Sequence, residues 1–343
     1  MPADRPTRAA ARYAAAAIAT LVYAFALGAA DAETIKIGVS KLATCGPLAI
    51  ARDKGYFAAE GLTPDFAFFD AQQPIAVAVA SGDLDFGIAA PTAALYSLAG
   101  SGTLRVIGGG VSEAPTFHYL GFIASNKAYD AGLKAVRDFA GHSVALTQVG
   151  TGLQYSLGLA ADKYGFDYKS VIFLALQSNA NIASALAGGR ADAAVFSSTG
   201  ALPLVERGDA KLLGWVGDET GGFQANFTFS SAKTADERRD TVERFLRAFR
   251  KGARDYHDAF ADRDGKRKDG PTSPEMLAII AKYLDQPEAI VERGLPYIDA
   301  DIRIDVADVQ HQLEWYRAQG LMKTEVKAEA LLDPRYVIPL PPR

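Results

Sequence analysis

The sequence has little of what metal-binding and disulfide-stabilised proteins depend on. Its 343 residues include one cysteine, Cys45, and four histidines, His118, His142, His257 and His311. One cysteine cannot form an intramolecular disulfide, and the histidines are scattered without an H-E-x-x-H pair or a Cys/His cluster. We therefore expect no disulfide framework, no metal site and no cofactor, and we expect Cys45 to be a small packing residue.

Positive charge is not in excess either. Lys and Arg number 36 against 40 Asp and Glu, which gives a formal net charge of −4, whereas a nucleic-acid-binding domain is usually strongly basic. Hydrophobic residues make up 49% of the chain and charged residues 22%, as in ordinary globular proteins. We therefore exclude a nucleic-acid binder and expect two domains, since a domain commonly has about 100–200 residues.

Long apolar runs are missing except at the N-terminus. Three arginines among the first twelve residues precede an uncharged, Ala-rich stretch over 13–27, and Ala30-Asp31-Ala32 places small residues where a signal peptidase reads them. The alternative is a membrane anchor, but many of these residues are alanine, and about 20 strongly apolar residues are usually needed to span a bilayer. We expect a signal peptide over 1–32, cleavage before Glu33 and a soluble mature protein in the periplasm.

Two blocks of alternating strands and helices follow. The first block predicts strands over 34–39, 64–69, 86–89 and 104–108 and helices over 48–54, 74–80 and 92–99. The second block predicts strands over 143–148, 171–176, 193–196 and 212–216 and helices over 153–164 and 181–187. Beyond residue 234 the periodicity predicts helices over 235–260, 273–283, 287–293 and 306–319. This alternation indicates an α/β fold with mostly parallel strands and helices on the sheet faces.

The order of these blocks predicts one lobe inserted into another. Extended apolar segments over 119–125 and 225–230 flank the second block and suit two strands that cross between lobes. We expect lobe 1 to comprise 33–122 and 225–343 and lobe 2 to comprise 123–224. A hinge at the crossing strands would then place a cleft between the lobes.

A short internal echo supports two lobes built alike. Ala80-Ser-Gly-Asp-Leu-Asp-Phe86 resembles Ala187-Gly-Gly-Arg-Ala-Asp-Ala193, and each segment joins a predicted helix to a short apolar strand. The glycines supply a left-handed helix stop. We expect Asp85 and Asp192 to bond backbone amides at the turn into the strand, which is a structural role.

Catalytic motifs are weak along the whole chain. Gly141-His-Ser-Val-Ala145 resembles a nucleophile elbow, but it ends in alanine and places Ser143 at the start of a strand. Gly150-Thr-Gly152 follows a strand and opens a helix, yet Tyr155 stands where a dinucleotide fingerprint needs glycine. Neither motif predicts an active site.

Small, hydroxyl-bearing loops at the carboxyl ends of the predicted strands are better candidates, because ligands bind at that edge of open α/β sheets. Thr151-Gly152 could clamp an anion on helix amides, or Thr151 could be a plain N-cap. Lys41 could neutralise a ligand carboxylate or sulfonate, or it could be a solvated surface lysine. Phe117, Tyr155 and Phe196 could line a wall, although each could equally be core.

Several collinear segments resemble the nitrate/sulfonate/taurine and thiamine-precursor group of periplasmic substrate-binding proteins. They are Ile35-Lys-Ile-Gly-Val39, Pro47-Leu-Ala-Ile-Ala-Arg-Asp-Lys-Gly-Tyr-Phe57, Glu60-Gly-Leu62, Gly82-Asp-Leu-Asp-Phe86, Val136-Arg-Asp-Phe-Ala-Gly-His-Ser-Val-Ala145 and Ala187-Gly-Gly-Arg-Ala-Asp-Ala193. The resemblance implies a two-lobed type II periplasmic binding protein fold, in which each lobe is a mixed sheet flanked by helices and two crossover strands form the hinge. It implies a monomeric receptor, without catalysis, that delivers a small organic anion to an ABC permease and ATPase in the inner membrane. Carried over by position, the ligand-binding residues are Lys41, Ala90, Thr92, Thr151, Gly152, Phe196 and Ser197.

Three alternatives stay open at the level of sequence. A receptor for a pyrimidine or thiamine precursor would need aromatic rings facing each other across the cleft. An enzyme on the same fold would need a nucleophile and base in the cleft, and the Cys-rich stretch of fungal pyrimidine-synthesis relatives is missing. A sensor subunit that presents the loaded state to a kinase would share every feature of the receptor.

Overall fold

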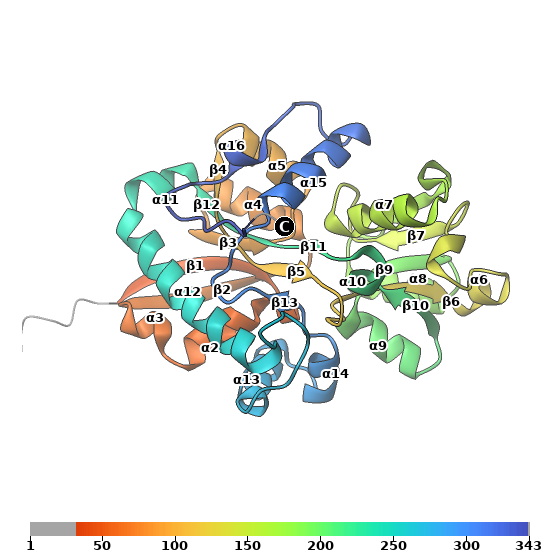
Figure 1. The fold of residues 1–343 in the computed structure, drawn as a ribbon, viewed down its shortest axis with the longest axis horizontal. Coiled ribbons are helices and arrows are strands. Elements are labelled where there is room, and N and C mark those ends of the chain that lie inside the picture. The colour runs from red at the N-terminus through yellow and green to blue at the C-terminus, as the bar shows by residue number, and fades with distance from the viewer. Residues whose placement is uncertain (1–31, 342–343) are drawn as a thin grey trace, which may run out of the picture.

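The computed structural model describes residues 32–341, which form two five-stranded sheets flanked by helices (Figure 1). The signal peptide expected over 1–32 lies outside the described residues, apart from Ala32. The first sheet has the order β2 (Leu62–Phe69), β1 (Glu33–Ser40), β3 (Phe86–Ala89), β12 (Phe227–Ser231) and β4 (Leu104–Gly109). The second has the order β10 (Ala210–Trp215), β6 (Leu120–Ser125), β9 (Ala193–Ser197), β7 (Ser143–Leu146) and β8 (Ile172–Ala175). The α/β architecture predicted from the alternating blocks is confirmed.

Both sheets are mixed in the same way. β1 runs parallel to β2 and β3, whereas β12 is antiparallel to β3 and β4. β7 runs parallel to β8 and β9, whereas β6 is antiparallel to β9 and β10. In each sheet the antiparallel strand, β6 or β12, is thus the strand that follows directly after the chain has crossed from the other sheet.

A correction concerns the segments that cross between the sheets. The segments predicted to cross, 119–125 and 225–230, coincide with β6 and β12, which are inner strands of the two sheets. The crossing is made just before them by β5 (Val111–Glu113) and β11 (Phe223–Gln224), which pair with each other and with β13 (Tyr297–Ile298). An apolar, extended sequence is typical both of buried sheet strands and of short crossing strands. The pattern alone therefore does not distinguish the two.

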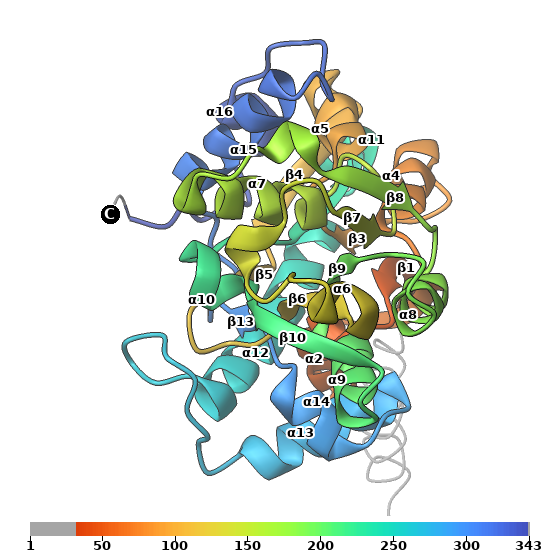
Figure 2. The same cartoon turned by 90° about the vertical axis from the view of Figure 1, so that its right-hand side faces the viewer.

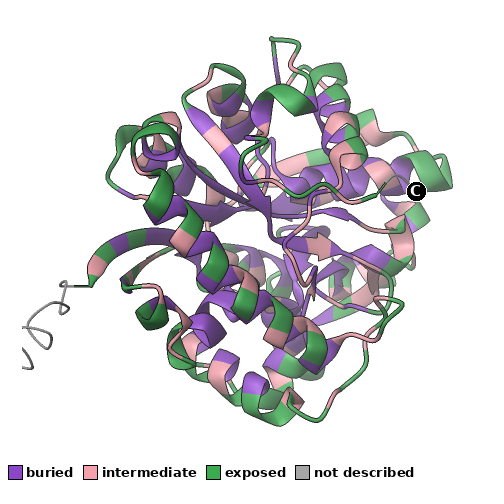
Figure 3. Ribbon diagram, turned by 60° about the vertical axis from the view of Figure 1, so that its left-hand side comes forward, coloured by how far each residue is buried: buried purple, intermediate pink, exposed green. Residues whose placement is uncertain are grey.

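Helices cover both sheets. Around the first sheet lie α2 (Gly46–Asp53), α3 (Tyr56–Ala59), α4 (Gln72–Ser81), α5 (Ala93–Gly100), α11 (Ala232–Glu237), α12 (Arg239–Phe260), α13 (Ser273–Leu284), α14 (Glu288–Arg293), α15 (Val306–Ala318) and α16 (Ala328–Leu331). Around the second lie α6 (Asn126–Asp130), α7 (Gly152–Tyr164), α8 (Asn179–Ala187), α9 (Ser198–Glu206) and α10 (Val216–Thr220). Figure 3 shows buried strands inside and helices with alternating buried and exposed positions outside. We propose that each large sheet with its helices is one lobe; β6 begins at Leu120, so the first boundary would fall before that residue.

Several helices differ from the sequence prediction: the short α3, α6, α10 and α16 were not predicted, and two longer segments also differ. The helix expected over 235–260 is broken at Arg238, whose φ of −120° and ψ of 47° are not helical, into α11 and α12. α9 was not predicted, because Gly200 and Pro203 within nine residues argue against a helix. The ring of Phe196 lies where a side chain at Gly200 would begin, so packing against β9 accounts for that glycine.

The predicted echo of the two lobes is confirmed in atomic detail. Asp85 accepts a hydrogen bond from the backbone N–H of Lys36 in β1 at 2.7 Å, and Asp192 accepts one from the backbone N–H of Ser143 in β7 at 2.9 Å. Gly82, with a φ of +87°, ends the preceding helix in the first lobe. Each aspartate therefore fixes a strand of its own sheet, which is the predicted structural role.

The crossing strand β5 carries a buried carboxyl group without a partner. Glu113 is 2% exposed, and neither carboxylate oxygen accepts a hydrogen bond. Burial raises its pKa well above the ordinary value of 4.5; the backbone N–H groups of Leu120 and Gly217 point at the carboxyl group and oppose this increase, and Asp218 adds to it. Glu113 is therefore protonated in the folded protein under conditions that ionise it in the unfolded chain.

We expect Glu113→Gln to stabilise the protein at high pH but not at low pH. Above pH 4.5 the native state binds more protons than the unfolded state, so stability falls as pH rises, and a neutral amide removes that loss. The expected gain in the free energy of unfolding is about 1–3 kcal/mol at pH 8 and close to zero at pH 4. Denaturant unfolding at both pH values measures it, with the exposed Glu292→Gln as control. An equal effect of Glu113→Gln at both pH values would contradict this account.

Candidate ligand site

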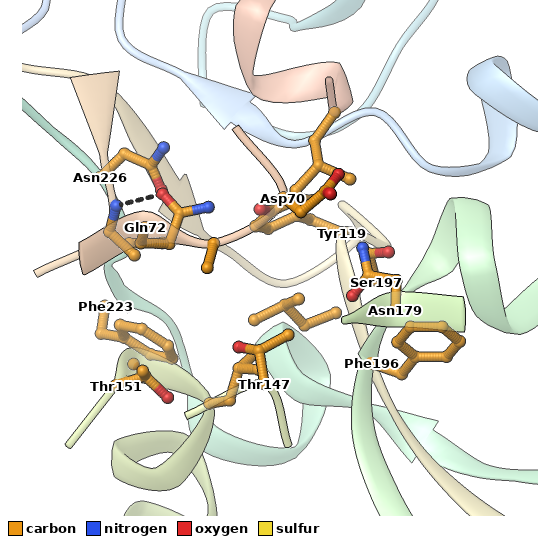
Figure 4. A pocket seen from close by; sticks show the side chains of 17 residues that line it. Asp70, Gln72, Tyr119, Thr147, Thr151, Asn179, Phe196, Ser197, Phe223 and Asn226 are labelled. Atoms are coloured by element: carbon orange, nitrogen blue, oxygen red, sulfur yellow. Dashed lines mark hydrogen bonds between the residues drawn. The ribbon is translucent and has the colours of Figure 1, made fainter. Parts of the chain in front are cut away.

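A cavity lies between the two sheets, at the carboxyl ends of their strands (Figure 4). The centres of water-sized groups can occupy about 60 Å³ of this cavity. That volume accommodates a few such groups. The residues lining it are Leu42, Asp70, Ala71, Gln72, Ala90, Tyr119, Leu120, Thr147, Thr151, Gly152, Leu153, Asn179, Phe196, Ser197, Phe223, Ala225 and Asn226. Both lobes and the crossing strand β11 therefore contribute to one site.

Four helices begin at the cavity. Its lining includes Ala71 and Gln72 at the start of α4, Thr151, Gly152 and Leu153 at the start of α7, Asn179 at the start of α8, and Ser197 directly before α9. The first N–H groups of a helix have no acceptor within the helix, and they carry the positive end of its dipole. Four such ends therefore bring unpaired backbone N–H groups to the cavity, an arrangement that favours a bound anion.

Buried polar side chains also face this space without a partner. Tyr119, Thr147 and Asn226 are 7%, 9% and 3% exposed, and within residues 32–341 no hydrogen bond is formed by the side chain of any of them. A buried polar group normally has a hydrogen-bond partner. These three side chains are therefore donors available to a bound molecule.

Gln72 is held in place by its neighbours. Its Oε1 accepts a hydrogen bond from the Ala90 N–H at 3.0 Å, the dashed line in Figure 4, and its Nε2 donates to Ser40 Oγ at 2.6 Å. The side chain amide thus joins the end of β1 to the loop after β3. One of its two N–H groups remains for a ligand.

The structure brings five of the seven predicted residues to the cavity: Ala90, Thr151, Gly152, Phe196 and Ser197. It does not bring Lys41 there. Lys41 is 48% exposed and lies 4.0 Å from Asp285, because the chain turns after β1 so that its neighbour Leu42 lines the cavity instead. Thr92 is also excluded, since it is buried as the N-cap of α5, where its Oγ1 accepts the Leu95 N–H at 3.0 Å.

Thr151 is not a side-chain N-cap. Its Oγ1 donates to the Gln148 carbonyl at 3.1 Å, and Gln154 and Tyr155 donate their backbone N–H groups to the Thr151 carbonyl. The amides of Gly152 and Leu153 are left at the open end of the helix. This geometry favours the anion-clamp interpretation over the plain cap.

Contacts between the lobes close the cavity on one side. Thr92 and Thr151 form an isolated antiparallel bridge, and the Ala93 N–H donates to the Gly150 carbonyl at 2.9 Å. The starts of α5 and α7 are thereby joined. Thr92, although absent from the lining, fixes the loop that carries Thr151.

The charge of the lining differs from the prediction. No lysine, arginine or histidine among residues 32–341 lines the cavity, and its one charged side chain is the exposed Asp70. Sequence reasoning missed Asp70, Gln72, Tyr119, Thr147, Asn179 and Asn226. Asp70, Thr147 and Asn179 lie at or near the ends of predicted strands or helices, and Tyr119 and Asn226 lie in the extended segments over 119–125 and 225–230. Nothing in the sequence indicated that these side chains would meet at one cavity.

The walls contain three aromatic rings. Tyr119, Phe196 and Phe223 line the cavity, and Figure 4 shows Phe223 and Phe196 on opposite sides of it. Of the other rings considered from sequence, Phe117 packs on Tyr297 at 5.4 Å and Tyr155 on Trp315 at 5.4 Å, so both belong to the core. The walls are apolar enough for an organic ligand body.

The two candidate nucleophiles considered from the sequence, Cys45 and Ser143, do not line the cavity. Cys45 is 3% exposed, and burial raises the pKa of its thiol to about 12, which confirms that it is a packing residue. Ser143 begins β7 and exchanges hydrogen bonds with Asp192 at 2.9 Å.

Residues 32–341 contain no group of three or more His, Cys, Asp or Glu side chains that could hold a metal ion. Over the same residues, every helix is too short or too polar to cross a bilayer.

Comparisons with known proteins agree with this architecture. The chain matches the family described as NMT1/THI5 like over residues 43–285, and no curated protein matches it. The alkanesulfonate-binding protein SsuA from Xanthomonas axonopodis pv. citri, solved with bound MOPS, is 22% identical, with a TM-score of 0.69 over 89% of this chain and 99% of that one. The aliphatic sulphonate-binding protein SsuA from Escherichia coli is 17% identical, with a TM-score of 0.66 over 91% and 94%. The nitrate-binding protein NrtA from Synechocystis PCC 6803 is 15% identical, with a TM-score of 0.65 over 88% and 85%.

Proposed function

The chain belongs to the NMT1/THI5-like family and has the fold of periplasmic binding proteins, and from this we propose that it is the solute receptor of an ABC importer. Its ligand would be a small organic anion held in the cavity between the lobes. The observation that carries this proposal is the meeting of four helix N-termini with buried, unpartnered neutral donors at one site between the lobes. Helix N-termini and backbone N–H groups are a common way to bind an anionic group.

Different lining residues would contact the anionic group and the organic part of the ligand. The amides of Gly152 and Leu153 and the side chains of Thr147 and Asn226 would hold the anionic group, a sulfonate or a carboxylate, by hydrogen bonds. Charge-assisted hydrogen bonds of this kind are stronger than neutral ones. Apolar walls such as Leu120 and Phe223 would cover the organic part. The crossing strands β5 and β11 would act as the hinge on which the lobes close.

The proposed cellular compartment and partners of the protein follow from the same family. We propose that the signal segment directs it to the periplasm and that the loaded receptor, as a monomer, meets an inner-membrane permease with its ATPase. No step of this function requires a reaction, and neither the buried Cys45 nor the hydrogen-bonded Ser143 lines the cavity. A pyrimidine or thiamine precursor is the competing ligand class.

A thermal-shift screen tests the ligand class. Bound ligand stabilises the native state by mass action, by about 2.7 kcal/mol at a concentration 100 times Kd. We expect at least one alkyl sulfonate or small carboxylate to raise the Tm of the purified protein, and neutral pyrimidines to leave it unchanged. A response to pyrimidines alone would replace the anion by the competing ligand class. No response to any of the three classes would remove the receptor proposal for these ligands.

A further inference from the structure

We infer that Asp308, on helix α15, is a positioning residue that holds two walls of the ligand cavity in register from outside the cavity. The inference rests on the proposed function of that cavity. α15 belongs to the segment that returns to the first sheet, yet it lies against α7 of the second lobe in Figures 1 and 2. Asp308 itself does not line the cavity.

The Asp308 carboxylate gathers donors from three segments. Its Oδ2 accepts the backbone N–H of Gln224 at 2.7 Å and Gln312 Nε2 at 2.7 Å. Its Oδ1 accepts the hydroxyl of Tyr155 at 3.3 Å. With its hydrogen directed to Asp308, the Tyr155 oxygen can accept Nδ1–H of His311, which lies 2.7 Å away. One carboxylate thus connects α15 to the crossing strand β11 and to α7.

Both attached segments carry lining residues beside the attachment point. Gln224 stands between Phe223 and Ala225, which line the cavity. Tyr155 lies in the first turn of α7, three residues after Gly152, and donates its backbone N–H to the Thr151 carbonyl at 3.1 Å. A shift at Asp308 would therefore move the Phe223 wall and the amide end of α7 relative to each other.

A second contact on α15 makes this attachment rigid. Gln312, fully buried, donates to the Gln224 carbonyl at 2.8 Å and accepts the Tyr96 hydroxyl at 2.9 Å. Trp315 covers Gly158 so closely that a Cβ there would stand 2.5 Å from its Nε1. The network joins α15, α5, β11 and α7 without any bond to the ligand space.

Positioning predicts an effect on ligand affinity that a purely structural role would not produce. Hydrogen-bond donors bind an anion well only where their geometry is fixed beforehand. Loosening the Asp308 network should therefore weaken binding under conditions in which the protein is fully folded. Because Tyr155 acts through Asp308, the effects of changing both should not add.

The test measures Kd for the tightest-binding anion in Tyr155→Phe, Asp308→Asn and the double variant, well below their Tm. We expect Kd to rise about threefold in Tyr155→Phe, about tenfold in Asp308→Asn, and no further in the double variant. Tyr164→Phe is the matched control, because it removes another tyrosine–carboxylate hydrogen bond of α7, to Glu219, far from the cavity; its Kd should not change.

The possible outcomes separate the two proposals. Unchanged Kd values with lowered Tm would overturn the positioning role and leave the receptor proposal intact, as would additive effects of the two substitutions. If Asp308→Asn does not fold, the comparison of Kd between Tyr155→Phe and Tyr164→Phe tests the positioning role by itself. Each of these two variants removes only one hydroxyl group. A wild-type protein that binds no anion would instead overturn the proposed function.

Discussion

Replacing Asn226 with aspartate will lower the affinity for the proposed anionic ligand by at least about 100-fold. The substitution keeps the shape of a side chain that is 3% exposed and lines the cavity, but at pH 8 it places a negative charge beside a bound anion. Two like charges 4 Å apart repel by about 4 kcal/mol at an effective dielectric constant of 20. Isothermal titration of both proteins with the same anion measures the difference.

Asp70→Asn is the matched control, because it makes the same exchange in the opposite direction. Asp70 is the charged side chain of the lining and is exposed to solvent, so screening limits its repulsion of the ligand. We expect a gain in anion affinity of no more than about fivefold. If Asn226→Asp bound the ligand as tightly as the unmodified protein, or Asp70→Asn bound it more weakly, the ligand would not be an anion held at this position.

Replacing Gly252 with alanine will destabilise the first lobe by about 3 kcal/mol, which is large for one methyl group. Gly252 lies in α12 where that helix crosses α2, and a Cβ there would stand 2.1 Å from the Pro47 carbonyl oxygen. The obstacle is backbone, which no rotamer change can move aside. The two helices would have to separate, and α2 also supports the turn after β1.

Urea unfolding followed by circular dichroism measures this loss, with Gly152→Ala as the control. Gly152 is also a helical glycine, but its nearest neighbour to a new Cβ is a ring carbon of Phe223 at 3.8 Å, an ordinary contact. Its stability should change by less than about 1 kcal/mol. Similar losses in both variants would mean that close packing of α12 on α2 is not the cause.

The sequence was most informative where structure depends on neighbours along the chain. Strand and helix periods predicted the α/β fold, and the Gly-then-Asp pattern at Asp85 and Asp192 predicted two capped turns that the structure contains. The strand-end loops predicted Thr151 and Gly152, and the family resemblance implied Ser197; all three line the cavity. These features are local, because a helix start or a turn is specified by a few adjacent residues.

The failures came from contacts between distant segments. Lys41 was chosen for its charge, yet one step in the turn after β1 directs Leu42 to the cavity and Lys41 to solvent. Asn226 and Tyr119 have no motif around them, and they become donors only because the crossing strands bring them to the carboxyl edge of both sheets. α9 forms despite Gly200 and Pro203 because its packing against β9 outweighs a weak local preference.

The sequence by itself thus determined the fold class, the two-block order of the chain and the loops at which a ligand would bind. Only the tertiary structure decided which side chains of those loops line the cavity, that four helix N-termini meet there without a basic residue in the described lining, and that α15 contacts α7. The physical reason is the same in each case. Backbone preferences act over a few residues, whereas the character of a cavity is set by groups that are far apart in the chain and meet only when both lobes have folded.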